Sequence, residues 1–351
     1  MGEAEIIDIG TARKAQRHQR EKCAATTSSG RPCRNYALAG SSYCRVHSND
    51  RVARERHPSH RPSSDELRKQ TPATHSDFFE WAESFINRRM SGDYPVDDFG
   101  YDPELAREVL LPLAKPLYER YFRVRTYGIE RIPATGPAIL VGNHSGTIPL
   151  DAVMVQYAVA IEHPNQRTVR NVAANLAFQM PFIGPLARKT GNAVAHDDDA
   201  EELLRRGEIL GVFPEGYKGV GKGWRERYKL QRFGRGGFVE LALKMRVPVI
   251  PVAIVGAEEA YPMIANAKWL AKALGFPYFP ITPTWPLLGP LGALPLPSRW
   301  AIEFGEPIPM DDYPEDAAED AMLVFDLSDR IRDTIQQMLY RNLSKRGGAF
   351  F

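Results

Sequence analysis

The sequence predicts a mixed α/β domain preceded by a small metal-binding module, and three observations support this prediction. Apolar runs of strand length alternate with stretches of helical length through the second half of the chain. All three cysteines fall within residues 23–44, close to a histidine. Between the two regions, residues 49–76 are polar, charged and proline-bearing, which is typical of a linker.

Composition limits the class of protein. A chain of 351 residues, 43% hydrophobic and 25% charged, can bury a full core. The net charge is +2, yet residues 1–75 hold 14 Lys and Arg against 8 Asp and Glu, so residues 1–20 form a basic N-terminal segment. We find no apolar signal segment and no run of 18 apolar residues free of helix breakers. We therefore expect a cytoplasmic protein without a transmembrane helix.

The large domain is predicted to span residues 77–345. Its amphipathic stretches predict helices at 78–86, at 103–121 with kinks at Pro112 and Pro116, and near 151–162, 200–207, 233–246 and 315–343. Its apolar runs predict strands at Ala138–Val141, Ile209–Phe213, Val249–Val255 and Trp300–Phe304. The last helix carries one apolar face expected to pack on the core: Val324, Leu327, Ile331, Ile335 and Met338.

Residues 273–298 contain seven prolines and no charged residue. Proline removes backbone donors and breaks helices, so this segment cannot cross a bilayer as a helix. Two alternatives remain: an apolar surface that touches lipid or roofs an acyl channel, or a buried crossover packed on the domain.

The cysteines and the nearby histidine have the composition of a zinc site. Cys23, Cys33, Cys44 and His47 occupy the segment 21–48, and three thiolates with one imidazole match the tetrahedral ligand set of structural zinc. A module of this size needs metal binding to fold. The alternative is three reduced thiols and an incidental histidine.

The segment from Lys22 to His47 resembles a short bacterial Cys3His zinc-finger-like module that is attached to otherwise unrelated proteins. Its basic residues would allow contact with nucleic acid, but Tyr36 and Tyr43 make a thin platform for bases, so we expect no nucleic-acid partner. A protein partner of the module is the more natural expectation.

A histidine and an aspartate follow the first long strand. His144 leaves the strand in a Ser-Gly turn, with Thr147 as a helix N-cap and Pro149 in the first turn, and Asp151 lies in that helix. The carboxylate can fold back onto the imidazole and hold it as a general base. Alone, the pair is also compatible with ordinary structure. Ser145 is not predicted to be a nucleophile, because its surroundings do not match G-x-S-x-G.

A second block lies about 70 residues later. Residues 209–216 read Ile-Leu-Gly-Val-Phe-Pro-Glu-Gly, and residues 247–256 contain Val-Ile-Pro-Val. Together with Asn143-His144 and Asp151, in this order and spacing, they resemble the glycerolipid acyltransferase superfamily over about residues 97–311. The resemblance implies a helix-flanked sheet of that type.

The resemblance also implies roles. His144 would be the base and Asp151 its partner, acting in direct acyl transfer without a catalytic metal. The donor would be acyl-CoA or acyl-ACP, and the acceptor a lipid hydroxyl at a membrane surface. Backbone N–H groups of residues 145–147 are expected to receive the developing oxyanion. The substrate-binding positions would be Asn143, Ser145, Gly146, Phe213, Pro214, Glu215, Gly216 and Lys218.

Two departures from the superfamily pattern bear on the substrate. Six residues separate His144 from Asp151, where four are usual, which resembles the monoacylglycerol and diacylglycerol acyltransferase-like branch. The arginine expected after a Gly-x-x-x stretch is missing from residues 191–197, which favours a neutral acceptor. Four cations leave a phosphate or coenzyme A partner open: Lys218, Lys222, Arg225 and Arg227.

Other readings remain. Gly216 to Lys222 satisfies G-x4-G-K, but Gly223 replaces the Ser or Thr that would bind magnesium, so nucleotide hydrolysis is not expected. The alternatives to a neutral-lipid acyltransferase are a phospholipid or lysophosphatidic-acid-type acyltransferase and an inactive lipid-binding adaptor. Salt-sensitive nucleic-acid binding through residues 1–75 is a third.

Overall fold

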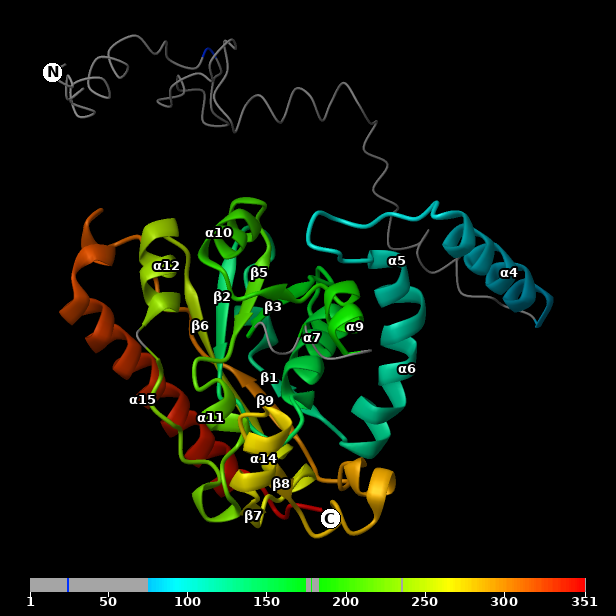
Figure 1. Ribbon diagram of the computed structural model, residues 1–351. Coiled ribbons are helices and arrows are strands. Elements are labelled where there is room, and N and C mark those ends of the chain that lie inside the picture. Colours follow the sequence, from blue (N-terminus) through cyan, green and yellow to red (C-terminus); the bar gives the residue numbers. More distant parts are fainter. Residues whose placement is uncertain (1–23, 25–74, 175–177, 179–182, 235, 351) are drawn as a thin grey trace, which may run out of the picture. The chain divides into compact units, whose positions relative to one another are not determined.

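The computed structural model describes residue 24 and residues 75–350, except for residues 175–177, 179–182 and 235 (Figure 1). The chain divides into two compact units, Met1–Met90 and Ser91–Phe351. The predicted basic segment 1–20, the four predicted zinc ligands and nearly all of the predicted linker lie outside the described residues.

Helix α4, His75–Ser91, is the described helix of the first unit and confirms the helical pattern predicted over residues 78–86. Phe78, Trp81 and Phe85 recur at intervals of three and four, which places their rings on one face of a helix. The ring centroids are 5.7 Å apart for Phe78 and Trp81, and 5.4 Å apart for Trp81 and Phe85. The three rings therefore form one continuous aromatic row.

The second unit contains a seven-stranded sheet in the order β1-β9-β6-β2-β5-β3-β4. Its strands are β1 (Arg125–Tyr127), β2 (Ala138–Gly142), β3 (Val169–Ala173), β4 (Ala193–Val194), β5 (Ile209–Val212), β6 (Val249–Val255) and β9 (Ala301–Phe304). All neighbours pair in parallel except β6 and β9, which are antiparallel. The predicted α/β class is confirmed.

The four predicted strands correspond to β2, β5, β6 and β9, with ends that agree within one residue. Three further strands of this sheet were not predicted, and each has a physical reason. β1 is an edge strand of three residues, and β4 has only two. β3 carries Arg170 and Asn171 in the middle of an otherwise apolar run, so it lacked the continuous apolar pattern of a buried parallel strand.

Helices connect the strands and cover both faces of the sheet (Figure 1). The longer ones are α7 (Leu150–Glu162), α9 (Ile183–Lys189), α10 (Asp197–Arg205) and α12 (Gly237–Met245). The short ones are η3 (Ile129–Arg131), α11 (Tyr217–Val220), η4 (Trp224–Glu226) and α13 (Ala257–Ala260). The helices predicted near 151–162, 200–207 and 233–246 are confirmed as α7, α10 and α12.

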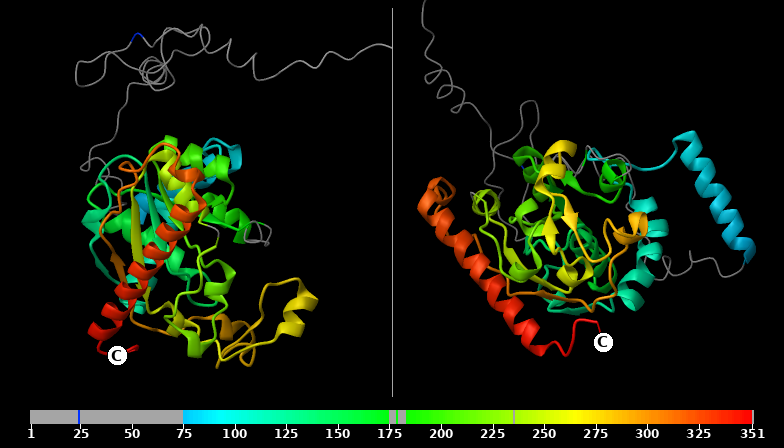
Figure 2. Two further views of the ribbon diagram at one scale, coloured as in Figure 1. Left: turned by 90° about the vertical axis from the view of Figure 1, so that its left-hand side faces the viewer. Right: turned by 60° about the horizontal axis from the view of Figure 1, so that its bottom comes forward.

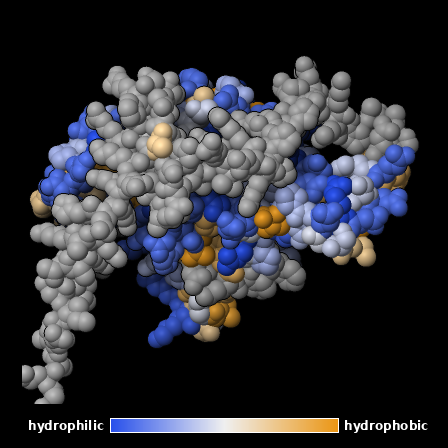
Figure 3. All heavy atoms as spheres, turned by 90° about the horizontal axis from the view of Figure 1, so that it is seen from above, coloured by the Kyte–Doolittle hydropathy of each residue, from blue (hydrophilic) through white to orange (hydrophobic). Residues whose placement is uncertain are grey.

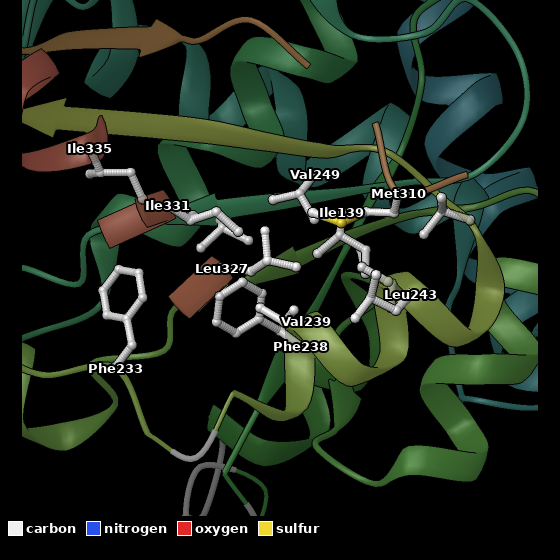
Figure 4. Packing of buried hydrophobic residues seen from close by; sticks show 14 of the residues in the cluster. Ile139, Phe233, Phe238, Val239, Leu243, Val249, Met310, Leu327, Ile331 and Ile335 are labelled. Carbon is white, nitrogen blue, oxygen red and sulfur yellow. The ribbon is translucent and has the colours of Figure 1, made fainter. Parts of the chain in front are cut away.

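Alternating residues of each central strand enter two separate cores. Ile139 and Val141 of β2 face a core formed with α10, α12 and the C-terminal helix α15 (Figure 4). Ala138 and Leu140 face the other core, formed with α7 and residues 118–132. Both faces of the sheet are therefore buried, which is why its strands read as continuous apolar runs.

The helical segment from Pro103 to Tyr121 is continuous but irregular. α5 (Pro103–Leu105) and α6 (Leu111–Pro116) are each followed by one wide π turn, η1 (Ala106–Leu110) and η2 (Leu117–Tyr121). Pro112 and Pro116 cannot donate to the helix ladder, and π turns are a common way to accommodate an interrupted ladder. The predicted helix is confirmed, with π turns before Pro112 and after Pro116.

The C-terminal helix α15 spans Ala321–Lys345 and begins later than the predicted residue 315. Asp320 caps it by accepting hydrogen bonds from the N–H groups of Met322 and Leu323, and a separate short turn, η6 (Ala317–Glu319), precedes it. Its predicted apolar face is confirmed, because all five of those side chains are buried.

Residues 256–300 form a long connection between β6 and β9, which we call the excursion. It contains β7 (Ala265–Asn266), α14 (Lys268–Leu274), β8 (Pro280–Ile281) and η5 (Gly289–Ala293). Leu287, Leu291 and Leu294 are exposed here, so the buried-crossover alternative for residues 273–298 is wrong and an apolar surface is present. No helix in the described part of the chain combines the length and apolar character needed to cross a bilayer.

Candidate active site

The loop after β2 brings His144 against Asp151. The imidazole Nδ1 lies 2.8 Å from the carboxylate Oδ2, and the Asp151 side chain is fully buried. Oδ2 also accepts from the N–H of Ser145, and Oδ1 accepts from the N–H of Ala152, each at 2.8 Å. The predicted contact is present despite the six-residue spacing, because Asp151 lies in the first turn of α7 where the chain folds back.

The contacts of Asp151 fix the orientation of the imidazole. The carboxylate accepts from two backbone N–H groups and so acts as the acceptor toward the imidazole as well; in neutral His144 this places the proton on Nδ1 and the lone pair on Nε2. The Phe213 ring lies against the imidazole, with centroids 4.9 Å apart. His144 is thus held on two sides, and 16% of its side chain stays exposed.

Two expectations for this loop are wrong. Thr147 is not the N-cap of α7; Pro149 takes that place, and the Thr147 hydroxyl donates to the carbonyl of Tyr261. The N–H of Ser145 is not available to an oxyanion, because it donates to Asp151. The second change follows from the burial of Asp151, whose carboxylate needs several hydrogen-bond donors.

Asn143 and Ser145 are fully buried. The Asn143 amide accepts from the N–H of Ile254 at 2.7 Å and donates to its carbonyl at 3.0 Å, so it continues the pairing of β2 with β6 by one residue. It also reaches the Ser145 hydroxyl at 3.4 Å. These two predicted substrate-binding residues therefore hold the loop in place, and neither presents a free polar group at the surface.

Glu215 lies beneath the loop. Its side chain is fully buried, Oε1 accepts from the N–H of His144 at 2.9 Å, and Oε2 accepts from the N–H of Gln231 at 2.6 Å. Glu215 was predicted to contact the substrate, but in this structure both oxygens are occupied by the protein. The carboxylate joins the two sequence blocks by holding the backbone of the histidine.

A buried lysine balances this charge. Lys222 Nζ lies 3.4 Å from Glu215 Oε2 and 3.1 Å from Glu258 Oε1, with 4% of its side chain exposed. Burial raises the pKa of the Glu258 carboxyl, while Lys222 acts in the opposite direction. The alternative that Lys222 binds phosphate loses its support, because its charge is already shared between two carboxylates.

The network extends away from the site. Tyr228 donates its N–H to Glu258 at 3.0 Å and its hydroxyl to Glu259, which also pairs with Arg346 at 3.0 Å. Glu258 and Tyr228 were missed by sequence reasoning. The available signal was the pair of adjacent acids directly after the buried strand β6.

Two glycines allow the close packing of this site. A Cβ on Gly219 would lie 2.5 Å from the carbonyl oxygen of His144 and 2.9 Å from its Cβ. Gly146 has φ +79°, and a Cβ there would lie 2.8 Å from the carbonyl oxygen of Ala257. Gly219 was missed because the run from Gly216 to Lys222 resembled a phosphate-binding loop.

The remaining predicted residues surround the site. Pro214 and Gly216 are half-buried in the turn after β5, while Lys218, Arg225 and Arg227 are exposed. Tyr278, from the excursion, donates its hydroxyl to the carbonyl of Thr147 at 2.7 Å. Burial, with a smaller contribution from Asp151, raises the pKa of Tyr278 to about 12, so it remains a donor at neutral pH.

No cluster of three or more His, Cys, Asp and Glu side chains that would suit a metal ion occurs among the described residues. The predicted zinc ligands Cys23, Cys33, Cys44 and His47 are not among them, and their role stays a prediction.

Comparisons with known proteins place this site in a family. A family model described as acyltransferase matches residues 123–255, which include His144, Asp151 and Glu215. An uncharacterized protein of Mycobacterium tuberculosis is 47% identical over 295 residues, covering 83% of this chain and 82% of that protein. One of Mycobacterium leprae is 49% identical over 267 residues, covering 76% and 73%.

Two more distant similarities were found. The human protein named DGAT1/2-independent enzyme synthesizing storage lipids is 26% identical over 216 residues, covering 61% of this chain and 60% of that protein. The solved structure of the 1-acyl-sn-glycerophosphate acyltransferase PlsC from Thermotoga maritima is 19% identical, with a TM-score of 0.46, and the match covers 76% of this chain and 90% of that chain.

The family model spans the strands and loops that carry the His144 site, and the chain covers most of the length of relatives nearly half identical to it. This chain therefore belongs to the acyltransferase family and is an acyltransferase.

Proposed function

We propose that the enzyme is an O-acyltransferase that moves a fatty acyl group from an acyl thioester to the hydroxyl of a lipid, with His144 as the general base. The observation that supports it best is the 2.8 Å contact between His144 Nδ1 and the buried Asp151 carboxylate. It leaves Nε2 as the proton acceptor.

In the proposed reaction the hydroxyl of the acceptor gives its proton to His144 Nε2 while its oxygen attacks the thioester carbonyl carbon. The carbon–sulfur bond then breaks, and the proton passes to the thiolate, which leaves as a free thiol. The N–H groups of Gly146 and Thr147 are the proposed donors to the oxyanion, since that of Ser145 is used by Asp151. The acyl donor is acyl-CoA or acyl-ACP.

We propose a neutral acceptor, such as a glyceride or a long-chain alcohol. Lys222, one of four cations available for a phosphate, is paired with Glu215 and Glu258. The arginine expected in residues 191–197 of phosphate-acceptor enzymes is missing. The 26% identical human protein is named for storage-lipid synthesis, which supports the same acceptor class. A phospholipid-type acceptor and an inactive lipid-binding adaptor are the alternatives.

The test is release of free thiol from a long-chain acyl-CoA, or from acyl-ACP, with detergent-dispersed glycerides, alcohols or lysophospholipids as acceptors. We expect release with a neutral acceptor, a loss of about 10²–10⁴-fold in His144→Ala, and near-normal turnover in the matched variant His196→Ala, which removes an exposed imidazole that makes no capping hydrogen bond before α10. Response only to lysophospholipids would select the phospholipid alternative. If no combination of acyl donor and acceptor released thiol, the inactive lipid-binding adaptor would be the remaining alternative.

We also propose that Cys23, Cys33, Cys44 and His47 bind one structural zinc ion and that the resulting module binds a protein partner. The support is the ligand set and its spacing in the sequence. The enzyme is proposed to be cytoplasmic and to act at a membrane surface, because its proposed acceptor resides there.

A further inference from the structure

The excursion between β6 and β9 exposes several large apolar side chains to solvent. We call it the apolar surface and define it by Ile264, Trp269, Leu287, Leu288, Leu291 and Leu294. Leu287 is 84% exposed, Trp269 76% and Leu291 69%. Residues 273–298 add no charge, and Lys268 and Lys272 lie exposed on α14 beside Trp269. So many exposed apolar residues in one segment indicate a contact surface.

A basic groove of about 490 Å³ lies at the start of β1 and β9 and the end of α15. Its five cations are Arg123, Arg125, Arg299, Lys345 and Arg346. Glu303 is the acidic residue in its lining, and that carboxylate is held by Arg341 and Asn342 at 2.6 and 2.7 Å. In the described part of the chain, no ion pair involves Arg125, Arg299 or Lys345, so the groove carries uncompensated positive charge.

The two features adjoin each other. Residues 295–299 join the apolar surface to the groove, with the Pro295 carbonyl accepting from the Tyr121 hydroxyl at 2.6 Å and the Pro297 carbonyl accepting from Arg123 at 2.6 Å. The excursion and the C-terminal end of α15 lie at the same, lower edge of the sheet in Figure 1 and in the left view of Figure 2. From above, the coloured side chains are mostly hydrophilic, with orange in small clusters (Figure 3).

This edge is also the edge of the catalytic site. β2, β5 and β6 are parallel, and the His144 loop follows the carboxyl end of β2. The excursion follows the carboxyl end of β6 and contacts the loop directly, because the Tyr278 hydroxyl donates to the Thr147 carbonyl and the Thr147 hydroxyl donates to the Tyr261 carbonyl. An object bound to the apolar surface would therefore lie at the edge of the sheet that carries His144.

We infer that the apolar surface and the basic groove together dock the enzyme onto an anionic lipid bilayer, with the apolar side chains in the interface and the groove over the headgroups. Exposed apolar side chains fit the boundary of the hydrocarbon region, and the cations beside them fit the layer of anionic headgroups above it. A second copy of this chain fits less well, since a symmetric contact would bring two basic grooves together. An acidic protein would match the groove but leave the leucines in water.

The inference rests on the proposed function in one respect, that the acceptor is a lipid; docking would present that lipid to His144. It adds which residues make the contact and which lipids are preferred. Vesicle binding measures the docking, and turnover of detergent-dispersed substrate measures the chemistry, so the two ideas can fail separately.

The experiment is flotation of the full chain with vesicles of phosphatidylcholine alone or mixed with phosphatidylglycerol. We expect binding to the mixed vesicles, reduced by salt. The variant Leu287→Ser/Leu291→Ser should lower the partition coefficient at least tenfold. Replacing Arg125, Arg299 and Lys345 by Ser should lower it about a hundredfold, at about fivefold for each cation.

Matched controls remove the same kinds of side chain elsewhere in the second unit. Leu113→Ser/Met322→Ser removes two apolar side chains that are 68% and 71% exposed, and Lys115→Ser/Lys229→Ser removes two surface cations, 61% and 60% exposed. Both should bind vesicles like the wild type. Variants of the apolar surface should also keep His144-dependent turnover in detergent, which shows that they are folded.

The inference is overturned if the wild type does not float with anionic vesicles, or if either the leucine or the cation variant binds like its control. It is also overturned if the leucine variant abolishes a concentration-dependent dimer in sedimentation while leaving vesicle binding intact. In each of these cases, turnover in detergent would still decide the proposed function independently.

Discussion

At the scale of single residues, the Asp151 carboxylate accepts hydrogen bonds from one imidazole and two backbone N–H groups, all at 2.8 Å. A side chain with that set of partners both orients His144 and stabilises the start of α7. Its burial makes it sensitive to any change of donor and acceptor character.

Asp151→Asn should lower kcat by about 10²–10⁴-fold with little change in KM, because an amide N–H must then face one of the three donors and the imidazole loses its fixed tautomer. The measurement is steady-state thiol release. Asp329→Asn on α15, a surface carboxylate paired with Arg332, is the control and should match the wild type. Turnover of Asp151→Asn within a few-fold of the wild type would contradict the proposed role.

Lys222 is the second sensitive residue. Lys222→Met should lower the free energy of unfolding by about 3–5 kcal/mol, because Glu215 and Glu258 would then be buried without their cation. Adding Glu258→Gln should recover part of that loss, since one buried charge is removed. Urea denaturation measures both, with exposed Lys218→Met, expected within about 0.5 kcal/mol, as control. Equal stability of the single and double variants would refute the coupling.

At the scale of elements, the turn after β5 supports the loop after β2. Gly219 lies within the short helix α11 and permits the backbone of that helix to lie against His144. Near the end of the chain, α15 stabilises the sheet by covering one of its faces with a row of buried apolar residues.

Gly219→Ala should reduce kcat about 10²-fold, because the new methyl group would lie 2.5 Å from the His144 carbonyl oxygen and the loop must move. Gly223→Ala is the matched control, since the nearest heavy atom to its Cβ is 3.9 Å away. Kinetics of both proteins should be compared alongside circular dichroism. A normal kcat for Gly219→Ala would mean that the loop tolerates displacement.

Ile335→Ala should cost about 2–5 kcal/mol of stability, because Ile335 is completely buried between α15 and the sheet. Met322→Ala on the same helix, 71% exposed, should change stability by no more than about 0.5 kcal/mol. Thermal and urea unfolding provide the comparison. Similar losses for the two would show that α15 does not dock as described.

At the scale of the whole molecule, the chain joins an acyltransferase unit to an N-terminal region with all three of its cysteines. If that region binds zinc without contributing to catalysis, loss of the zinc should leave turnover unchanged. Zinc content and turnover can both be measured on the full chain.

We expect about one zinc ion per chain by elemental analysis, lost in Cys33→Ser and kept in Ser28→Ala. Turnover of detergent-dispersed substrate should be unchanged in Cys33→Ser. Absence of zinc from the wild type, or full zinc content in Cys33→Ser, would reject the predicted ligand set. A parallel loss of turnover would instead tie the module to the catalytic unit.

Much of the site could be predicted because its key residues are close in sequence or belong to recognisable blocks. β2, β5 and β6 are buried on both faces, so their apolar runs identify them. His144 and Asp151 are seven residues apart, and a strand, a turn and a helix start bring them together. These features depend on local chain geometry and on burial. Both leave a direct trace in the order of apolar and polar residues along the sequence.

What only the tertiary structure decided is where the polar groups of the blocks point. Glu215 accepts from the backbone N–H of His144, which is 71 residues away in the sequence. Lys222, between β5 and β6, pairs with Glu258, which follows β6. Such contacts depend on which loops meet at the sheet edge and on the need of each buried charge for a partner. The same need turned the expected substrate contacts Asn143, Ser145 and Glu215 inward, because at full burial each must bond to protein rather than to a ligand.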